Sequence, residues 1–197
     1  MAHEMGDTPA TEKSMEPVSL QLAGGRICTI RLSVETDAAA LCAFMPKTHG
    51  ESDFLNYLPG EWDLSVEEEV KFSRDRKESD RSVLIVAEVD GCIVATAGVE
   101  SMKFRRFAHH AELGMTVAKE YWGQGIGRKL MECIIDWARQ RKLRKLYLRV
   151  FESNHRANAL YGSQGFVEEA RLKGDFLRRD GTYGDTIVMA KFFPAWS

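Results

Sequence analysis

The residues with the clearest chemical potential form the segment Gly123-Gln124-Gly125-Ile126-Gly127-Arg128. Three glycines in five positions let successive backbone amides turn toward one point, and apolar residues follow at helical spacing. Amides in the first turn of a helix have no partners within it and lie at the positive end of the helix dipole. Arg128 and Lys129 add positive charge. The segment therefore predicts an anion-binding site at a helix N-terminus.

Three other interpretations compete for the same glycines. A P-loop requires Gly-x-x-x-x-Gly-Lys-Ser/Thr, whereas Gly127 is followed by Arg128-Lys129-Leu130, with no hydroxyl to hold magnesium. A dinucleotide-binding turn has the spacing Gly-x-Gly-x-x-Gly directly after its strand, and Glu152 would match its ribose-binding acid. Here the spacing is Gly-x-Gly-x-Gly, and the five residues 118–122 separate it from the preceding strand. The third alternative is a tight strand-to-helix connection without a ligand.

The elements around this segment predict a mixed sheet. Runs of β-branched and alternating apolar residues predict strands over 27–32, 83–88, 92–99, 111–117, 146–151, 166–176 and 186–193. Apolar periodicity and capping residues predict helices over 36–44, ending before Pro46, over 65–76, from 126 to about 138 and over 154–164. Asp90-Gly91 and Asp180-Gly181 predict hairpin turns. The strand, helix and strand across 111–151 imply one right-handed parallel crossover in an otherwise antiparallel sheet.

Two local features sharpen this outline. Ser65-Val66-Glu67-Glu68 has the form of a capping box, in which a hydroxyl and a carboxylate satisfy free amides at the start of a helix. Gly114 lies inside the predicted strand 111–117, where a glycine often marks a bulge or the close approach of another backbone or ligand. Taken alone, Gly114 is explained as well by an incidental glycine.

The composition excludes several classes of function. A chain of 197 residues that is 44% hydrophobic suits one domain, predicted over 18–197, and residues 1–17, without an apolar run, predict a disordered N-terminal tail. A net charge of −2 gives no overall attraction to nucleic acid or anionic lipid, and no stretch approaches the roughly 20 apolar residues of a membrane span. We therefore expect neither nucleic acid nor membrane as a partner.

The four cysteines are widely spaced and form no Cys-x-x-Cys pair; they are Cys28, Cys42, Cys92 and Cys133. Each lies among apolar neighbours, as structural cysteines do. The pattern predicts no metal site and a reducing, cytoplasmic setting.

Three groups of residues together resemble a known family. They are Glu112-Leu113-Gly114-Met115-Thr116-Val117, then Tyr121-Trp122-Gly123-Gln124-Gly125-Ile126-Gly127, then Asn154-x-x-Ala157-x-x-Leu160-Tyr161-x-x-x-Gly165-Phe166. In this order and spacing they resemble the GNAT family of acetyl-CoA-dependent N-acetyltransferases, over about residues 27–193. The resemblance implies an α/β (α+β) fold, with a mostly antiparallel sheet of about six to seven strands, splayed at its central parallel pair and flanked by about four helices.

The resemblance also implies the ligand and its contacts. Acetyl-CoA would be the cosubstrate, with its pantetheine arm along the strand that ends at Val117 and its diphosphate on the glycine segment. Without the family, Asn154 would be a helix N-cap and Tyr161 a core aromatic residue. The implied contacts are Met115, Thr116, Val117, Gly123, Gln124, Gly125, Ile126, Gly127, Arg128, Asn154, Asn158 and Tyr161.

Acyl transfer to an amine requires two proton transfers. A free alkyl amine near pKa 10 is mostly protonated, so a base should remove its proton, and the leaving thiolate benefits from a donor. The resemblance implies Tyr161 as that donor. Glu112 is the candidate base, because it lies on the opposite parity from Leu113 and Met115 and can face an acceptor cleft. A solvated strand carboxylate is an equal alternative.

The acceptor is the least determined part. Glu51, Asp53 and Phe54 lie in a segment rich in carboxylates and aromatics that could bind a cationic acceptor. The branch that acetylates a ribosomal-protein alanine has a glutamate base at the position of Arg149, which weighs against that acceptor. No cysteine has the setting of a nucleophile, which favours direct attack in a ternary complex.

We therefore predict an enzyme that acetylates the primary amine of a small molecule, such as an amino acid or polyamine. Residues near the C-terminal hairpin, among them Asp180 and Asp185, resemble those branches. A protein or peptide N-acetyltransferase and a catalytically silent acyl-CoA-binding module are the alternatives. The sequence leaves open whether the chain forms a homodimer.

Overall fold

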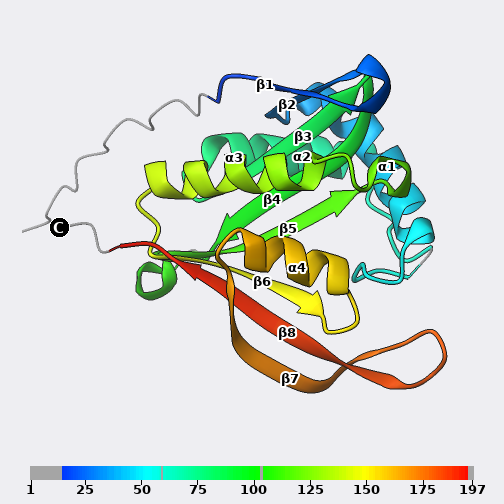
Figure 1. Ribbon diagram of the computed structural model, residues 1–197. Helices are drawn as coiled ribbons and strands as arrows, with labels where there is room; N and C mark the ends of the chain where they lie inside the picture. The colour runs from blue at the N-terminus through cyan, green and yellow to red at the C-terminus, as the bar shows by residue number, and fades with distance from the viewer. Residues whose placement is uncertain (1–14, 59, 103, 195–197) are drawn as a thin grey trace, which may run out of the picture.

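The computed structural model describes residues 15–58, 60–102 and 104–194 (Figure 1). Of the predicted disordered tail, residues 1–14 lie outside the described residues, and Met15 packs against the hydrophobic core. The domain boundary at residue 18 stays a prediction.

Eight strands of the described chain form one sheet, in the order β1-β2-β3-β4-β5-β6-β8-β7. Their bounds are β1 (Val18–Gln21), β2 (Ile27–Leu32), β3 (Ser82–Val89), β4 (Cys92–Ser101), β5 (His110–Val117), β6 (Lys145–Phe151), β7 (Val167–Leu177) and β8 (Tyr183–Phe192). Neighbours are antiparallel except β5 and β6, so the predicted fold class is confirmed. The predicted six to seven strands become eight because β1 pairs with β2, and its four residues are too few to show a clear period.

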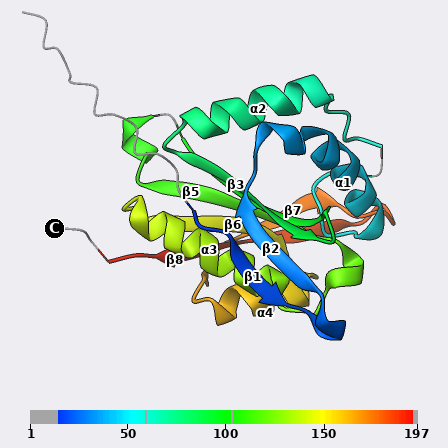
Figure 2. The ribbon, with the colours of Figure 1, turned by 90° about the horizontal axis from the view of Figure 1, so that it is seen from above.

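The helices cover both faces of this sheet. They are α1 (Ala38–Glu51), α2 (Val66–Glu78), α3 (Ile126–Gln140) and α4 (His155–Ser163), with short 3-10 helices η1 (Ala23–Gly25), η2 (Glu35–Asp37), η3 (Arg105–Phe107) and η4 (Lys119–Tyr121). Seen from above, α1 and α2 lie on one side of the strands and α3 and α4 on the other (Figure 2). None of the helices in the described ranges combines the length and apolar character needed to cross a bilayer.

The two helices before β3 show where local sequence rules hold and where they fail. The predicted capping box begins α2: the Ser65 hydroxyl accepts from the Glu68 amide, and Glu68 Oε2 accepts from the Ser65 amide. The predicted end of α1 before Pro46 is wrong, because the helix continues to Glu51 with Pro46 inside it. Leu41 and Phe44 of this helix are buried in the core, and Thr48 Oγ1 donates to the Phe44 and Met45 carbonyls in the turn around the proline.

Helix α3 follows the predicted apolar stripe. Leu130 and Ile134 are fully buried, and each such side chain contributes about 1.5–3 kcal/mol to the free energy of unfolding. Trp137 and Ala138 continue the same face into the core, and Cys133 packs at its margin. This burial fixes the N-terminal end of α3 against the sheet, which is where the glycine segment lies.

The sheet opens where β5 and β6 stop pairing. Only His110, Ala111 and Glu112 of β5 pair with β6, although the two strands continue to Val117 and Phe151. The predicted splay is therefore confirmed. Of the alternatives for Gly114, a bulge is excluded, because Gly114 pairs in register with Gly98 of β4; a Cβ on Gly114 would meet no atom within 4 Å. Open space at this glycine agrees with the other prediction made for it, the approach of a ligand.

Candidate active site

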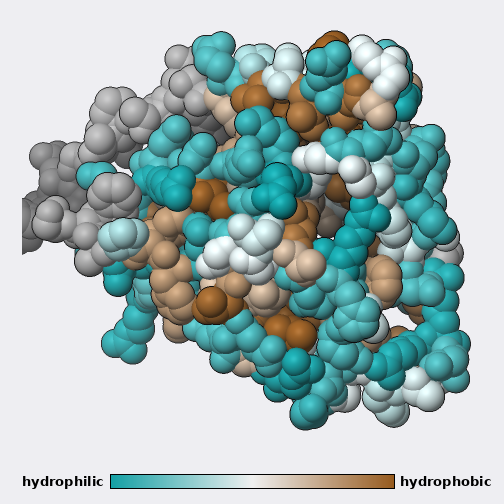
Figure 3. All heavy atoms as spheres, in the orientation of Figure 1, coloured by the Kyte–Doolittle hydropathy of each residue, from teal (hydrophilic) through white to brown (hydrophobic). Residues whose placement is uncertain are grey.

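A large cavity occupies the gap between the diverging strands. Its volume is about 1200 Å³, and its walls come from the end of α1 and the segment after it, β4, β5, the glycine segment, β6, α4 and β7. Figure 3 shows the surface hollowed between the end of β5 and α4. The cavity therefore brings together residues from 45 to 186 in the sequence.

The N-terminus of α3 opens into this cavity without a side-chain cap. Ser65 and Asn154 cap α2 and α4 through their side chains, whereas the N-cap of α3 is Gly125, with φ of 90°. The amides of the first turn of α3 are thus left for a ligand, and the helix dipole makes an anion the favoured one. A Cβ on Gly127 would lie 3.3 Å from Leu160 Cδ2, so glycine lets α3 begin this close to α4. The predicted diphosphate of acetyl-CoA fits this end of the cavity.

Two arginines add charge at the same end. Arg128 lines the cavity, as predicted for a cofactor contact. Arg156 also lines it, with its guanidinium 5.3 Å from the Trp122 ring centroid and Nη2 3.4 Å from the position of a Cβ on Gly123. Arg156 is not expected from the sequence, although one signal exists: a cation in the first turn of α4 opposes the helix dipole, and such local conflicts concentrate at functional sites.

The remaining predicted cofactor contacts divide into two groups. Met115, Thr116 and Val117 line the cavity along the unpaired side of β5, and Ile126 and Asn154 line it from the two helices. Gln124 and Asn158 are not among the lining residues. Gln124 Nε2 donates to the Glu120 carbonyl at 3.1 Å, and Asn158 Nδ2 donates to backbone carbonyls that include that of Asn154 at 2.9 Å. Both amides hold the backbone beside the cavity, and their contact with the cofactor stays a prediction.

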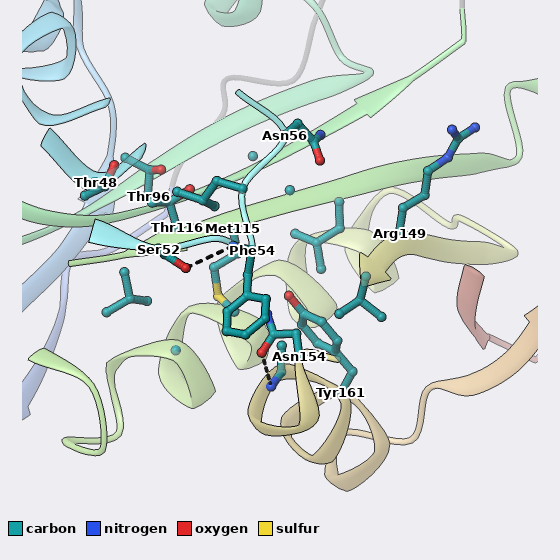
Figure 4. A pocket seen from close by; sticks show the side chains of 18 of the residues that line it. Thr48, Ser52, Phe54, Asn56, Thr96, Met115, Thr116, Arg149, Asn154 and Tyr161 are labelled. Carbon is teal, nitrogen blue, oxygen red and sulfur yellow. Dashed lines mark hydrogen bonds between the residues drawn. The ribbon is translucent and has the colours of Figure 1, made fainter. Parts of the chain in front are cut away.

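Tyr161 lies at the base of the cavity on α4. The residue is 8% exposed, and burial raises the pKa of its hydroxyl to about 12. The hydroxyl therefore stays protonated at neutral pH and can donate. Figure 4 shows Tyr161 beside Asn154, whose Oδ1 accepts from the Ala157 amide at 3.1 Å, the N-cap role expected from the sequence.

Glu112 lies at the point where the strands separate. Tyr147, its pairing partner on β6, donates a hydrogen bond from its hydroxyl to Glu112 Oε2 at 3.0 Å. Burial and the negative charge of Glu112 raise the pKa of Tyr147, which keeps this donor protonated. Arg149 Nε lies 3.7 Å from Glu112 Oε1. The half-buried carboxylate is thus held in one orientation, and neither Tyr147 nor this geometry is visible in the sequence.

The segment after α1 contributes unequally to the cavity. Glu51 lines it, and Glu51 Oε2 accepts from the Lys119 amide at 2.9 Å at the start of η4. Phe54 lines it and projects toward Asn154 (Figure 4). Asp53 is not a lining residue; its Oδ1 lies 2.6 Å from Arg179 Nε, near the tip of the β7–β8 hairpin. Of the three residues predicted to bind substrate, Glu51 and Phe54 therefore line the cavity, and Asp53 lies outside it in an ion pair with Arg179.

The cysteines of the described residues lie outside this cavity. All four cysteines are free, and none is among the lining residues that the structure describes. Burial raises the pKa of the thiols of Cys28, Cys42 and Cys133, which disfavours their thiolates. No three His, Cys, Asp or Glu side chains of the described ranges lie together as metal ligands would. The absence of a bound metal stays a prediction.

Comparison with known proteins places this arrangement in a family. Residues 51–166, which include the glycine segment, β5, β6 and α4, match the model of the acetyltransferase (GNAT) family. The chain belongs to the GNAT family. The predicted family resemblance is thereby confirmed, and the cavity lies at the splay of the GNAT sheet.

Two curated relatives differ in acceptor. The chain is 40% identical over 76 residues to the [ribosomal protein bS18]-alanine N-acetyltransferase of Escherichia coli, covering 39% of this GNAT chain and 51% of the relative. It is 34% identical over 88 residues to the spermidine N(1)-acetyltransferase of Vibrio cholerae, covering 44% and 50%. The chain thus spans about half the length of the curated relatives it matches.

Solved structures resemble the chain over most of its length. A GNAT acetyltransferase from Streptococcus pneumoniae matches with a TM-score of 0.82 and 29% identity, covering 84% of this chain and 99% of that one. The protein yncA of Salmonella typhimurium, solved with its cofactor acetyl-CoA, matches with a TM-score of 0.76 over 86% and 96%. At 20% identity, this second likeness concerns the fold alone.

The positive φ of Gly125 leads to a first prediction. At Gly125 the backbone has a left-handed conformation, which costs about 1–3 kcal/mol for alanine. In Gly125→Ala the loop should therefore change conformation, and its backbone amides should no longer point toward one site. We expect the Kd for coenzyme A, measured by calorimetry, to rise about 10-fold. Gly181→Ala is the control, because Gly181 has φ of 83° and lies at the hairpin tip away from the cavity. Equal affinity in the two variants would contradict a diphosphate site at this loop.

Proposed function

We propose that this GNAT protein transfers an acetyl group from acetyl-CoA to the primary amine of a small molecule, by direct attack in a ternary complex. The observation that carries the proposal is that Glu112 and Tyr161 line the same cavity as the uncapped N-terminus of α3. One cavity would then supply a proton acceptor for the amine, a proton donor for the leaving thiolate and an anion site for acetyl-CoA.

The residues at the α3 end of the cavity suit coenzyme A. The amides after Gly125, with Arg128 and Arg156, would hold the diphosphate, and the free edge of β5 from Leu113 to Val117 would hold the pantetheine amides. When bound, acetyl-CoA supplies an acetyl thioester. Its acyl end would then lie toward Tyr161 and Glu112, because the glycine segment fixes the opposite end.

The protein's own groups handle two protons. Glu112 takes one proton from the acceptor ammonium, which frees the lone pair that forms the new C–N bond, and the second proton that this nitrogen loses on becoming an amide passes to solvent in the open cavity. As the C–S bond breaks, the Tyr161 hydroxyl gives its proton to the sulfur, whose conjugate acid has a pKa of about 8.5. Glu112 and Tyr161 can then exchange protons with solvent through the open cavity. The products are an amide and the free thiol.

The cavity wall favours a small acceptor. Asp53 on the segment after α1 and Arg179 on the β7–β8 hairpin form an ion pair, which links the two sides at the outer edge. A peptide would need an open groove beside Glu112. A peptide N-terminus is the second candidate, because one relative is named for a ribosomal-protein alanine.

The proposal is tested by measuring thiol release from acetyl-CoA over a panel of amino acids, polyamines and peptides. Release with small amines at higher kcat/KM than with any peptide is the expected result. Faster release with peptides would replace the small molecule by a protein acceptor. Coenzyme A binding by calorimetry with no release across the panel would instead support a silent binding module.

Two further expectations are kept as proposals. Four free cysteines agree with the reducing, cytoplasmic setting expected from the sequence. A homodimer is the second of these proposals.

A further inference from the structure

Arg149 is a charged side chain that lines the cavity next to Glu112. On β6, Leu148 and Val150 are buried, whereas Tyr147, Arg149 and Phe151 share the opposite, more exposed face; all but Leu148 line the cavity. Its side chain is 58% exposed, and among the described residues its one ion-pair partner is Glu112, reached through Nε at 3.7 Å. The two terminal nitrogens of the guanidinium therefore keep their hydrogen-bond donors available to a ligand.

The walls beside Arg149 are aromatic. The Phe151 ring stacks on Phe176 with centroids 3.7 Å apart, and Tyr147 lies on the other side along the strand. Because the Arg149 side chain is 58% exposed, solvent screens an ionic hydrogen bond formed there, and the aromatic walls reduce this screening only on one side. Figure 4 shows Arg149 rising from β6 away from Tyr161, so a group bound to it would lie farther out than the reacting amine.

We propose that the acceptor carries a carboxylate beside its primary amine, as a free α-amino acid does, and that Arg149 binds this carboxylate. The proposal rests on the proposed function and names its substrate class. Glu112 and Arg149 are neighbours of opposite charge, which matches a ligand whose ammonium and carboxylate groups are a few atoms apart. A planar guanidinium binds a carboxylate through two parallel hydrogen bonds, which fixes the orientation of the amine as well.

A polycation is the competing acceptor. Glu100 and Asp175 also line the cavity and would attract one. Arg149 would repel such a ligand at the position next to Glu112, where the reacting amine must lie. The carboxylate reading therefore accounts for Arg149, and the polycation reading does not.

The test compares three ligands with the same side chain: an α-amino acid, its carboxamide and its decarboxylated amine. With the wild-type protein, kcat/KM for the amino acid should exceed that for the carboxamide by about 10- to 100-fold, the range of a charge-assisted hydrogen bond. In Arg149→Gln this ratio should fall to about one. Arg149→Lys should keep part of it, because lysine keeps the charge but loses the paired hydrogen bonds.

Arg171→Gln is the matched control, because Arg171 lies on β7 and pairs with Glu168 away from the cavity. It should keep the wild-type ratio. Preference for the carboxamide or for spermidine in the wild type, or an unchanged ratio in Arg149→Gln, would overturn the proposal.

Equilibrium binding separates this proposal from the proposed function. Amino acid and carboxamide are titrated by calorimetry into protein saturated with coenzyme A, where no turnover is needed. Tighter binding of the amino acid, lost in Arg149→Gln, would support the carboxylate site even if no amine were acetylated. Equal binding of the two ligands would refute the site even if amines were acetylated.

Discussion

Replacing Tyr161 with phenylalanine is expected to lower kcat by about 100- to 1000-fold, because the leaving thiolate loses its proton donor. The Tyr161 ring is buried and only its hydroxyl is removed, so the packing of α4 and the affinity for coenzyme A should change little. Single-turnover rates and calorimetry measure the two quantities separately. A variant that binds coenzyme A normally but turns over slowly is the expected result.

The pH dependence gives an independent check on this residue. Burial raises the pKa of Tyr161 to about 12, so its donating, protonated form persists throughout the neutral and moderately alkaline range. Tyr161→Phe should therefore have a lower kcat by the same factor across that pH range, and its plot of kcat against pH should show no additional fall at alkaline pH. Tyr183→Phe is the control, because Tyr183 is 70% exposed on β8 and does not line the cavity. Unchanged turnover in Tyr161→Phe would remove Tyr161 from the mechanism.

Replacing Glu112 with glutamine should lower kcat/KM at neutral pH by about 100-fold or more, because the acceptor ammonium loses its proton acceptor. Glutamine keeps the shape of the side chain, and its carbonyl can still accept from the Tyr147 hydroxyl. The deficit should shrink as the pH approaches about 10, where the amine loses its proton to solvent. Measuring kcat/KM of the wild type and of Glu112→Gln from neutral pH to about pH 10 tests whether the two values approach each other.

A constant deficit at every pH would mean that Glu112 has a structural role and is not a base. No deficit would mean that water removes the proton. Glu168→Gln provides the control for loss of a carboxylate, because Glu168 lies on the exposed face of β7 and pairs with Arg171. That variant should match the wild type throughout.

Local sequence patterns predicted the elements that hold the site. The period of α3, the capping box at Ser65 and the Asp90-Gly91 turn each depend on residues a few positions apart, and each is confirmed. Local rules failed at Pro46, where the packing of α1 through Leu41 and Phe44 outweighs the helix-breaking tendency of proline. They also missed β1, whose partner rather than its own period makes it a strand.

Family resemblance selected one ligand for the glycine segment. The glycines by themselves indicated an anion, and a dinucleotide would have suited them nearly as well. The motifs around Gly114, Asn154 and Tyr161 narrowed that anion to coenzyme A. In the same segments, the side-chain amides of Gln124 and Asn158 donate to backbone carbonyls. A sequence motif cannot distinguish such an internal hydrogen bond from a contact with a ligand.

By itself, the sequence therefore predicted a helix N-terminus suited to an anion and the strands on either side of it, and the family resemblance implied Tyr161 as the proton donor, a role that stays a proposal. Only the tertiary structure decided how the acceptor side is built. Tyr147 lies 35 residues from Glu112 in sequence, Arg149 two residues further, and Arg156 reaches the glycine segment from another helix. Such contacts depend on where β5 and β6 stop pairing, and that point is set by the packing of the whole sheet rather than by any local run of residues.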